Sequence, residues 1–184
     1  ELGKIHKNLI IISGDTSTSA GLDRFKNNFP DKYLDVGIAE QNMMGIAAGL
    51  SGEGHRVITT TFAPFQTMRC CEQIKVNLGY MKNKVIMVGL ASGLSLGILG
   101  YTHCSIEDVG VLRSIPGITI ISPADSASTI KATFEAIKHD ESIYLRLTGA
   151  VPNPPVYTND FDFTIGKSNV ILDHGRDIAI IACG

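Results

Sequence analysis

A single carboxylate stands among small apolar residues in the stretch DVGIAEQNMMGIAAGLSGEGH, residues 35–55. Glu40 has glycine and isoleucine shortly before it, two methionines shortly after it, and no charged residue within four positions. An acid in apolar surroundings resists ionisation unless it finds a hydrogen-bond partner, and a ring nitrogen of a ligand would be such a partner. The alternative is a solvated acid in the first turn of a helix, where the helix dipole favours negative charge.

Two aromatic side chains follow in the stretch TTFAPF, residues 60–65. Phe62 and Phe65 stand on either side of Pro64, directly after an apolar run that predicts a strand. Parallel α/β sheets bind ligands at the carboxyl ends of their strands, so these rings could form a stacking wall for a planar heterocycle. The alternative is a pair of core aromatics that cap the edge of the sheet.

A histidine ends the glycine-rich segment LASGLSLGILGYTHCSIED, residues 90–108. Glycine and serine recur in this segment, which predicts a long loop that can be shaped around a ligand. His103 lies at the end of the loop, just before a predicted helix, and we expect it to contact substrate. The alternative is a structural or solvated histidine.

Six short β-branched runs alternate with helical patterns along the chain. The predicted strands are residues 8–15, 32–37, 56–62, 84–91, 118–125 and 142–147. Near-continuous apolar runs are typical of parallel strands that are covered on both faces. We therefore expect an α/β fold with a doubly wound, mostly parallel sheet and helices on both of its faces.

Four helices are predicted between these strands, at residues 40–51, 65–78, 106–113 and 122–140. The first ends at Gly52 and Gly54, as glycine commonly ends a helix. The last has Asp125 or Ser126 as its N-cap and a core stripe at Ile130, Phe134 and Ile137.

The composition changes near residue 150. The stretch GAVPNPPVYTND contains three prolines and cannot hold a helix. We therefore expect a first domain at residues 1–152, a linker at 153–162, and the truncated start of a second α/β domain at 163–184, where two short apolar runs predict strands. The absence of an initial methionine suggests a fragment or a processed product.

The overall composition excludes several classes of protein. The chain is 44% hydrophobic and 18% charged, which predicts a sizeable core. A net charge of −2 without a basic block argues against binding to nucleic acid. No signal peptide or membrane-length apolar run is present, so no membrane partner is expected. The four cysteines show neither zinc spacing nor a disulfide pattern, which favours the reducing cytoplasm.

Four stretches together resemble the pyrimidine-binding domain of transketolase. They are GIAEQNMMGIAAGL, TTFAPFQTMRCCEQIKVNLGY, GYTHCSIEDVGVLRSIPGITIISPAD and IYLRL. The resemblance runs in order from about residue 8 to 152, and the tail resembles the start of the transketolase C-terminal domain. It implies the thiamine-diphosphate-binding fold. 1-Deoxyxylulose-5-phosphate synthase and the β subunits of 2-oxoacid dehydrogenase E1 components share parts of this pattern and remain alternatives.

The resemblance implies an enzyme that transfers two-carbon ketol units between ketoses and aldoses. In this family the glutamate that matches Glu40 hydrogen-bonds N1′ of the thiamine diphosphate aminopyrimidine and favours the imino tautomer, which deprotonates the thiazolium C2. Phe62 and Phe65 match ring-stacking positions, and Met68 matches a further cofactor-binding position. His103 matches a histidine of the substrate channel, which makes it a second catalytic candidate.

Two further positions match more weakly. Ser19 matches a serine near the phosphate end of the substrate, and Asp15 matches an aspartate at the dimer interface. Gly14-Asp15 also looks like the Gly-Asp-Gly start of a thiamine-diphosphate signature, but residue 16 is threonine and the paired asparagines, Asn27 and Asn28, follow too soon. We therefore expect no metal site and no diphosphate site in this chain.

Three expected substrate-binding residues are missing. A phosphate-binding histidine falls at Ala91, an aspartate that contacts sugar hydroxyls falls at Leu99, and a phosphate-binding arginine falls at Gly149. Arg146 lies three positions before the last of these. Because each charge-assisted contact contributes roughly 1.5–3 kcal/mol, we expect either a substrate other than the usual pentose phosphate or a different hold on the phosphate.

The resemblance also implies partners. The diphosphate and its Mg²⁺ are expected on a domain or subunit absent from this chain, with active sites formed in a homodimer or a heteromer. The chain alone is expected to be inactive and to belong to a single-chain or a split enzyme. The alternative from another class is a non-catalytic interaction domain that keeps the same fold and binds no cofactor.

Overall fold

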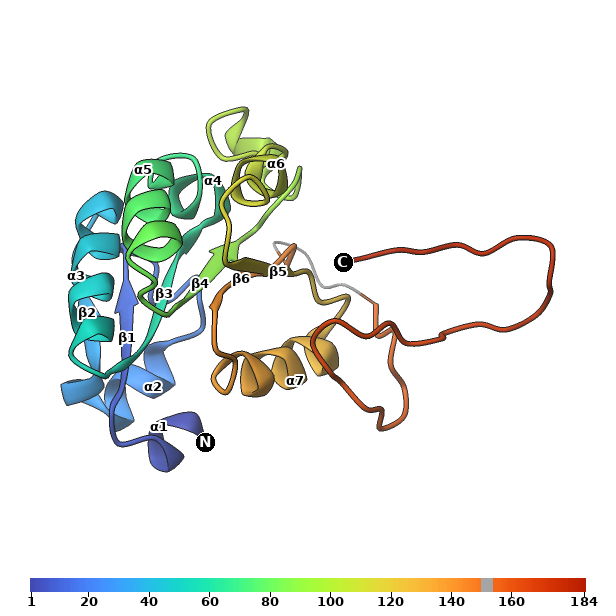
Figure 1. Ribbon diagram of the computed structural model, residues 1–184, viewed down its shortest axis with the longest axis horizontal. Coiled ribbons are helices and arrows are strands. Elements are labelled where there is room, and N and C mark those ends of the chain that lie inside the picture. Colours follow the sequence, from blue (N-terminus) through green and yellow to red (C-terminus); the bar gives the residue numbers. More distant parts are fainter. Residues whose placement is uncertain (150–153) are drawn as a thin grey trace.

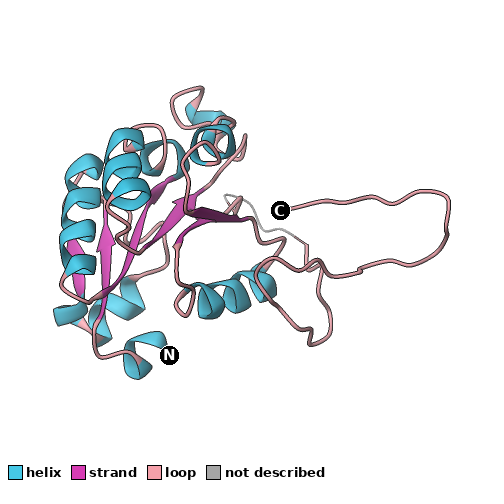
Figure 2. Cartoon of the chain, in the orientation of Figure 1, coloured by secondary structure: helices cyan, strands magenta, loops and turns pink. Residues whose placement is uncertain are grey.

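The computed structural model describes residues 1–149 and 154–184, and its six strands form one parallel sheet (Figures 1 and 2). The strands are β1 (Leu9–Ser13), β2 (Tyr33–Asp35), β3 (Arg56–Phe62), β4 (Val85–Leu90), β5 (Ile118–Ile121) and β6 (Ser142–Arg146). Their order across the sheet is β2-β1-β3-β4-β6-β5. The predicted parallel α/β sheet is therefore confirmed.

Short helices connect these strands. In the described residues they are α1 (Leu2–Ile5), α2 (Asp23–Asn28), η1 (Pro30–Lys32), α3 (Glu40–Gly52), α4 (Ala63–Gln66), α5 (Cys71–Gln73), η2 (Ile74–Tyr80), η3 (Gly97–Leu99), α6 (Asp108–Leu112) and α7 (Ser126–Ala136). The single helix expected over residues 65–78 is wrong: a turn separates α4 from α5, which continues directly into the π-helix η2.

Helices cover both faces of the sheet, as expected for a doubly wound fold (Figure 2). On one face, α3, η2 and α6 pack against the sheet around a buried cluster that includes Met43, Met44 and Met87. On the other face, α7 and the first residues of the chain pack around Leu9, Ala132 and Ile143. These two cores fix the loops at the carboxyl ends of the strands.

The N-cap of α7 is Asp125, one of the two predicted residues. Its carboxylate accepts a hydrogen bond from the backbone N–H of Ser128 at 2.8 Å, and the Ser128 hydroxyl completes a capping box. The predicted core stripe is only partly right, because Ile137 is buried but Ile130 is 59% exposed. Ile130 instead lines an apolar groove of about 390 Å³ between α7 and the sheet.

Residues 154–184 carry no helix or strand. Phe163 and Ile165 pack against the core beside α7, and the chain then loops outward before its end returns toward β5, where Gly184 lies near Ser122 (Figure 1). The first part of this segment is anchored to α7, because Asp125 also accepts hydrogen bonds from the backbone N–H groups of Val156 and Tyr157 at 2.9 and 3.0 Å. The predicted domain end at 152 and the first linker residue, 153, lie outside the described residues. The second domain at 163–184 stays a prediction.

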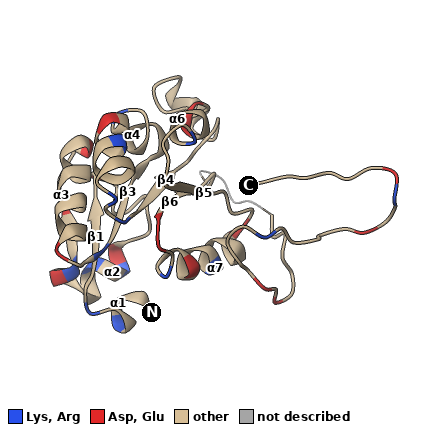
Figure 3. Cartoon of the chain, in the orientation of Figure 1, with Lys and Arg blue, Asp and Glu red and all other residues tan. Residues whose placement is uncertain are grey.

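Charges of both signs are interspersed over the surface (Figure 3). Both signs occur on α2 and on α7. None of the helices formed by the described residues combines the length and the apolar composition needed to cross a bilayer.

Candidate functional site

The candidate site lies where the connections of the sheet diverge. The chain leaves β1 over one face to reach β2, and returns over the other face through α3 to reach β3 on the opposite side of β1. Helix connections that diverge in this way leave a crevice at the carboxyl ends of the strands, where open α/β sheets bind ligands. Gly14, Glu40 and Phe62 all lie at this end, at or after the ends of β1, β2 and β3.

Glu40 is the first residue of α3, and its side chain is only 3% exposed. Its Oε1 accepts a hydrogen bond from Nη1 of Arg69 at 2.7 Å, across 29 positions of sequence. Gly14 leaves space for it, because a Cβ atom on Gly14 would lie 3.3 Å from Cγ of Glu40. The alternative of a solvated first-turn acid is therefore wrong: the carboxyl is buried and has a cationic partner.

Phe62, Phe65 and His103 form an aromatic cluster beside this carboxyl. The ring centroids of Phe62 and Phe65 lie 6.4 Å apart. The His103 ring lies 5.9 Å from Phe62 and 5.2 Å from Phe65, edge-on to both. The structure thus brings together an acid, two phenylalanines and a histidine that come from three separate segments of the chain.

Arg69 connects the carboxyl to the aromatic cluster, and the sequence patterns did not predict it. Its guanidinium carbon lies 3.9 Å from the centroid of the Phe65 ring while Nη1 binds Glu40. The backbone carbonyl of Arg69 accepts a hydrogen bond from Nε2 of Gln41 at 3.0 Å. Arg69 is visible in the sequence directly after Met68. Its partner Glu40 lies 29 positions away, so local sequence spacing does not pair the two residues.

Cys70 follows Arg69 and is fully buried. Burial raises the pKa of its thiol to about 12, and the nearby Glu40 carboxylate adds to this rise. The thiol donates a hydrogen bond to the carbonyl of Phe65 at 3.1 Å. Cys70 is therefore a packing residue under the site and not a nucleophile.

The remaining predicted site residues lie nearer the surface. Met68 is 48% exposed in the turn between α4 and α5. Ser19 is exposed in the loop between β1 and α2, and no side-chain interaction joins it to the Glu40 group in the described part of the chain. Asp15 is also exposed; it adopts a φ of +59°, and its N–H donates to Asp35 at 3.1 Å.

The positions that lack the expected substrate-binding residues lie at the same end of the sheet. Ala91 follows β4 with a φ of +51°, which non-glycine residues adopt only where the surrounding structure holds them. Leu99 lies in η3, and Gly149 is exposed outside any helix or strand. Arg146 donates from Nε to the buried carboxylate of Asp108 at 2.8 Å, so part of its guanidinium is already engaged.

Several buried hydroxyl groups near this end have no hydrogen-bond partner among the described residues, including those of Thr61, Ser92 and Ser105. Thr61 directly precedes Phe62, and the segments of Ser92 and Ser105 are bridged by hydrogen bonds between Gly93 and Ser105. Buried polar atoms normally have a hydrogen-bond partner. Buried hydroxyl groups without one are therefore typical of a site that binds a polar ligand. Together with the buried acid and the edge-on aromatic cluster, they fit a planar nitrogen heterocycle.

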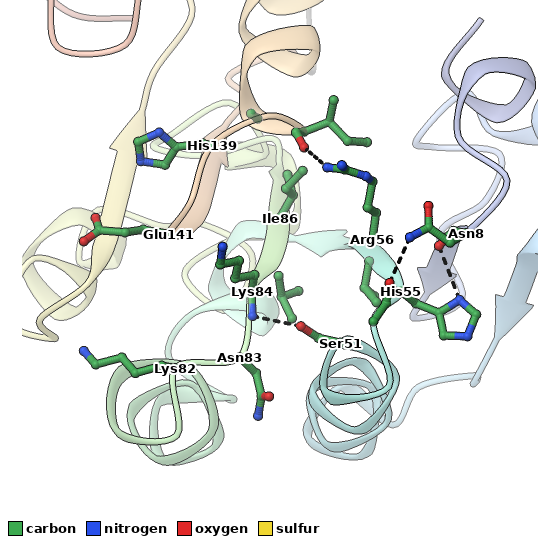
Figure 4. Close-up of a pocket in the computed structure, with 15 residues that line it drawn as sticks. Asn8, Ser51, His55, Arg56, Lys82, Asn83, Lys84, Ile86, His139 and Glu141 are labelled. Atoms are coloured by element: carbon green, nitrogen blue, oxygen red, sulfur yellow. Dashed lines mark hydrogen bonds between the residues drawn. The ribbon is translucent and has the colours of Figure 1, made fainter.

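A separate cavity of about 340 Å³ lies at the opposite, amino end of the strands (Figure 4). Its lining includes Arg56 and Lys84, but Arg56 donates to the carbonyl of Ile137 and Lys84 pairs with Asp140 at 3.0 Å. This cavity holds none of the predicted site residues, and its two named cations already have partners.

Comparison with known proteins agrees with this geometry. The family model described as the transketolase pyrimidine-binding domain matches residues 1–150. The chain is 39% identical over 185 residues to one subunit of the apulose-4-phosphate transketolase of Phocaeicola vulgatus, with 100% of this chain and 59% of that protein covered. It is 35% identical over 176 residues to the 6-deoxy-6-sulfo-D-fructose transketolase subunit SqwH of a Clostridium species, covering 96% and 54%.

A solved structure described as a split gene transketolase, inactive beta4 tetramer, has the same fold. It superposes with a TM-score of 0.80 at 31% identity, over 92% of this chain and 54% of the other. The chain thus spans little more than half the length of these relatives. The family match covers the whole sheet and every residue of the candidate site, and the chain therefore belongs to the transketolase family through its pyrimidine-binding domain.

Proposed function

We propose that the full-length protein is the pyrimidine-binding subunit of a split transketolase, which uses thiamine diphosphate to move two-carbon ketol units between ketoses and aldoses. Relatives named as separate transketolase subunits support the split arrangement. The single observation that carries the proposal is the buried Glu40 carboxyl beside the Phe62–Phe65–His103 cluster.

Each residue of the site has a role that its position supports. Glu40 is placed to hydrogen-bond a ring nitrogen and hold a proton there, and burial strengthens such a bond. Phe62 and Phe65 offer faces on which the ring can stack. Met68, about half exposed in the turn that carries Arg69, is proposed as a further contact to the cofactor. When bound, thiamine diphosphate supplies the electron sink that allows a carbon–carbon bond beside a ketone to break.

His103 has a different role from Glu40. Its Nδ1 lies 3.0 Å from the Thr102 hydroxyl, and its ring stands edge-on to both phenylalanines at the end of the glycine-rich loop. A ring held in this way can orient a substrate hydroxyl or transfer a proton to it. We therefore assign His103 to the substrate channel, with Ser19 nearer the far end of the substrate.

A partner subunit would complete the site. Exposed apolar residues gather on the loops and helix starts at the carboxyl end of the sheet: Ile38, Leu94, Ile98, Leu99, Tyr101 and Ile106. An apolar surface of this kind suits burial against another protein. We propose that this partner subunit holds the diphosphate and Mg²⁺. We also propose that Asp15 lies at an interface between subunits and that the assembly contains at least two active sites.

The chain alone should be inactive, because it would lack the diphosphate site. The solved relative described as inactive is a tetramer of one type of subunit, which agrees with this expectation. All four cysteines are free in the structure, which suits a reducing compartment such as the cytoplasm.

The substrate is proposed to differ from the usual pentose phosphates of central carbohydrate metabolism, or to have its phosphate held by other groups. Ala91 and Gly149 carry no charge, and Arg146 already binds Asp108. The relatives from Phocaeicola and Clostridium are named for different sugars. Steady-state rates with phosphorylated and plain ketoses test this proposal. Equal or better turnover of xylulose 5-phosphate would contradict a different substrate and would favour a phosphate held by other groups.

Replacement of Glu40 by glutamine tests the proposed function itself. In the assembled enzyme, Glu40→Gln should lower kcat by about 10²-fold or more, because amide replaces the group that shares the proton. Glu53→Gln is the matched control at the exposed opposite end of α3. Near-normal activity of Glu40→Gln would favour the non-catalytic interaction domain, and product formation with pyruvate as donor would favour a deoxyxylulose-phosphate synthase or an E1 β subunit.

A further inference from the structure

The Arg69 side chain contacts two groups of the site at once, the Glu40 carboxylate and the Phe65 ring. Its Nη1 lies 2.7 Å from Oε1 of Glu40, and its guanidinium carbon lies 3.9 Å from the centroid of the Phe65 ring. One planar, cationic group therefore donates a hydrogen bond along its edge to a buried carboxyl and presents its face to an aromatic ring.

A planar aminopyrimidine needs the same two surfaces. Under the proposed function, its ring nitrogen hydrogen-bonds Glu40 and its face stacks on Phe65. With Arg69 in place, Oε1 of Glu40 and one face of the Phe65 ring are occupied, and the Glu40 side chain is only 3% exposed, so the aminopyrimidine has no open approach to both groups. We propose that Arg69 is a placeholder, which holds Glu40 and Phe65 while the cofactor is absent and must swing away before the aminopyrimidine can bind. This inference rests on the proposed function.

The position of Arg69 allows this movement. Its side chain is 40% exposed, whereas that of Glu40 is 3% exposed, so the guanidinium can move into solvent while the carboxyl stays in place. The backbone of Arg69 is held separately: its N–H donates to the carbonyl of Pro64 at 3.2 Å, and its carbonyl accepts from Gln41 at 3.0 Å. A change of side-chain rotamer is therefore sufficient.

The placeholder role of Arg69 also explains how the fold tolerates the buried Glu40 carboxylate when no cofactor is bound. A buried carboxylate that lacks a partner is strongly destabilising, and Arg69 supplies both a positive charge and a hydrogen-bond donor. When the ring displaces the guanidinium, the ring nitrogen takes over as hydrogen-bond partner. Arg69 thus stabilises the cofactor-free form and lowers the apparent affinity for cofactor, because only the fraction with Arg69 displaced can bind.

Calorimetric titration of thiamine diphosphate into the full-length subunit, assembled with its diphosphate-binding partner and Mg²⁺, tests the inference. Arg69→Ala should lower the Kd about fivefold or more, a typical size for coupling between two binding events. Arg69→Lys should fall between wild type and Arg69→Ala, because lysine keeps the charge but lacks the planar face. Arg113→Ala is the matched control, an exposed arginine on the loop before β5, and should leave Kd unchanged.

A Glu40→Gln background separates the placeholder from other effects. There the gain from Arg69→Ala should shrink, because the ion pair that competes with the cofactor no longer exists. The cofactor-free Arg69→Ala assembly should also unfold at a lower temperature than wild type. If Arg69→Ala does not fold, Arg69→Lys provides the same comparison with the same expected direction.

The outcomes distinguish this inference from the proposed function. If wild type binds thiamine diphosphate and both Arg69 variants bind it equally or more weakly, the placeholder is wrong and the proposed function stands. A cofactor-bound structure in which Arg69 still contacts Glu40 and Phe65 would lead to the same conclusion. If wild type and all variants bind no cofactor, both the proposed function and the placeholder are wrong.

Discussion

Gly14 lies against Glu40, and a Cβ atom at residue 14 would come within 3.3 Å of Cγ of the glutamate. The same Cβ would lie 3.5 Å from the side chain of Thr61, which belongs to the neighbouring strand. The space that receives the carboxyl is therefore made by the absence of a side chain after β1. Two residues therefore position Glu40: Arg69 hydrogen-bonds its carboxylate, and Gly14 leaves room for its side chain.

Gly14→Ala should therefore displace the Glu40 carboxyl by a few tenths of an ångström. Because small misplacements of a reacting group can cost up to about 10²-fold in rate, we expect kcat/KM of the assembled enzyme to fall roughly tenfold. Steady-state kinetics measure this loss. The control is Gly45→Ala on the exposed face of α3, where an added Cβ meets nothing within 4 Å. Gly45→Ala should stabilise the helix, and an equal loss of activity in both variants would contradict the prediction.

Asp108 is a second buried acid with a structural role. Its Oδ2 accepts hydrogen bonds from the Tyr144 hydroxyl at 2.9 Å and from Nε of Arg146 at 2.8 Å, and its side chain is fully buried. Burial and the adjacent carboxylate raise the pKa of Tyr144, so its hydroxyl stays a donor. The network joins α6 to β6 below the glycine-rich loop that carries His103.

Asp108→Ala should destabilise the chain by roughly 3–5 kcal/mol, because Arg146 would lose the partner of a partly buried charge. Tyr144→Phe should cost less, since Arg146 continues to neutralise the carboxylate. Urea unfolding measures both changes. Asp140→Ala is the control, because its ion pair with Lys84 is exposed and should leave the midpoint unchanged. A small effect of Asp108→Ala would show that the network is dispensable.

The sheet was predictable from sequence because its four central strands, β1, β3, β4 and β6, are covered on both faces. Buried parallel strands need continuous apolar runs, and all six runs are strands in the structure. The helices were harder to predict. Residues 65–78 have a helical apolar spacing, but a turn around Met68 and Arg69 interrupts them. On α7 the sheet packs against small residues, Ala132 and Ala136, and the bulkier Ile130 stays exposed.

The site was predictable only in part. The resemblance placed Glu40, Phe62, Phe65 and His103 together, and the structure brings the three rings into contact. The ion pair between Glu40 and Arg69 could not be predicted from the sequence. No charged residue lies near Glu40 along the chain, and Arg69, 29 positions later, approaches it only in the folded structure. The space that Gly14 leaves for Glu40 likewise depends on the pairing of β1 with β3. This pairing joins segments far apart in the sequence, so no short motif predicts it.

Asp125 makes the stability of α7 depend on pH. Hydrogen bonds from the backbone of Ser128 and Tyr157 hold the pKa of its carboxyl below the ordinary value of 3.8. A group whose folded-state pKa is lowered stabilises the protein fully above its unfolded pKa, and this contribution is lost as pH falls through the folded value. The wild-type chain should therefore lose stability below about pH 4, beyond the loss from its other acids.

Asp125→Asn tests this dependence, because asparagine is also a good N-cap but does not titrate. Its urea midpoint should fall less than that of wild type between pH 6 and pH 3. Asp125→Ala should cost roughly 1–2 kcal/mol at neutral pH through loss of the cap. It should also speed proteolysis near Tyr157, whose N–H the carboxylate holds at 3.0 Å. A parallel acid response of wild type and Asp125→Asn would contradict the assignment.

Cys70 should resist alkylation although it lies directly beside a cationic residue. An adjacent arginine normally lowers the pKa of a thiol, but here burial and Glu40 outweigh Arg69 and raise it to about 12. At pH 8 almost none of this thiol would be ionised, and the thiolate is the reactive form. Peptide mapping after iodoacetamide treatment should therefore find the exposed Cys183 modified and Cys70 unmodified. In urea both should react, and rapid labelling of folded Cys70 would show that the segment carrying Arg69 opens readily.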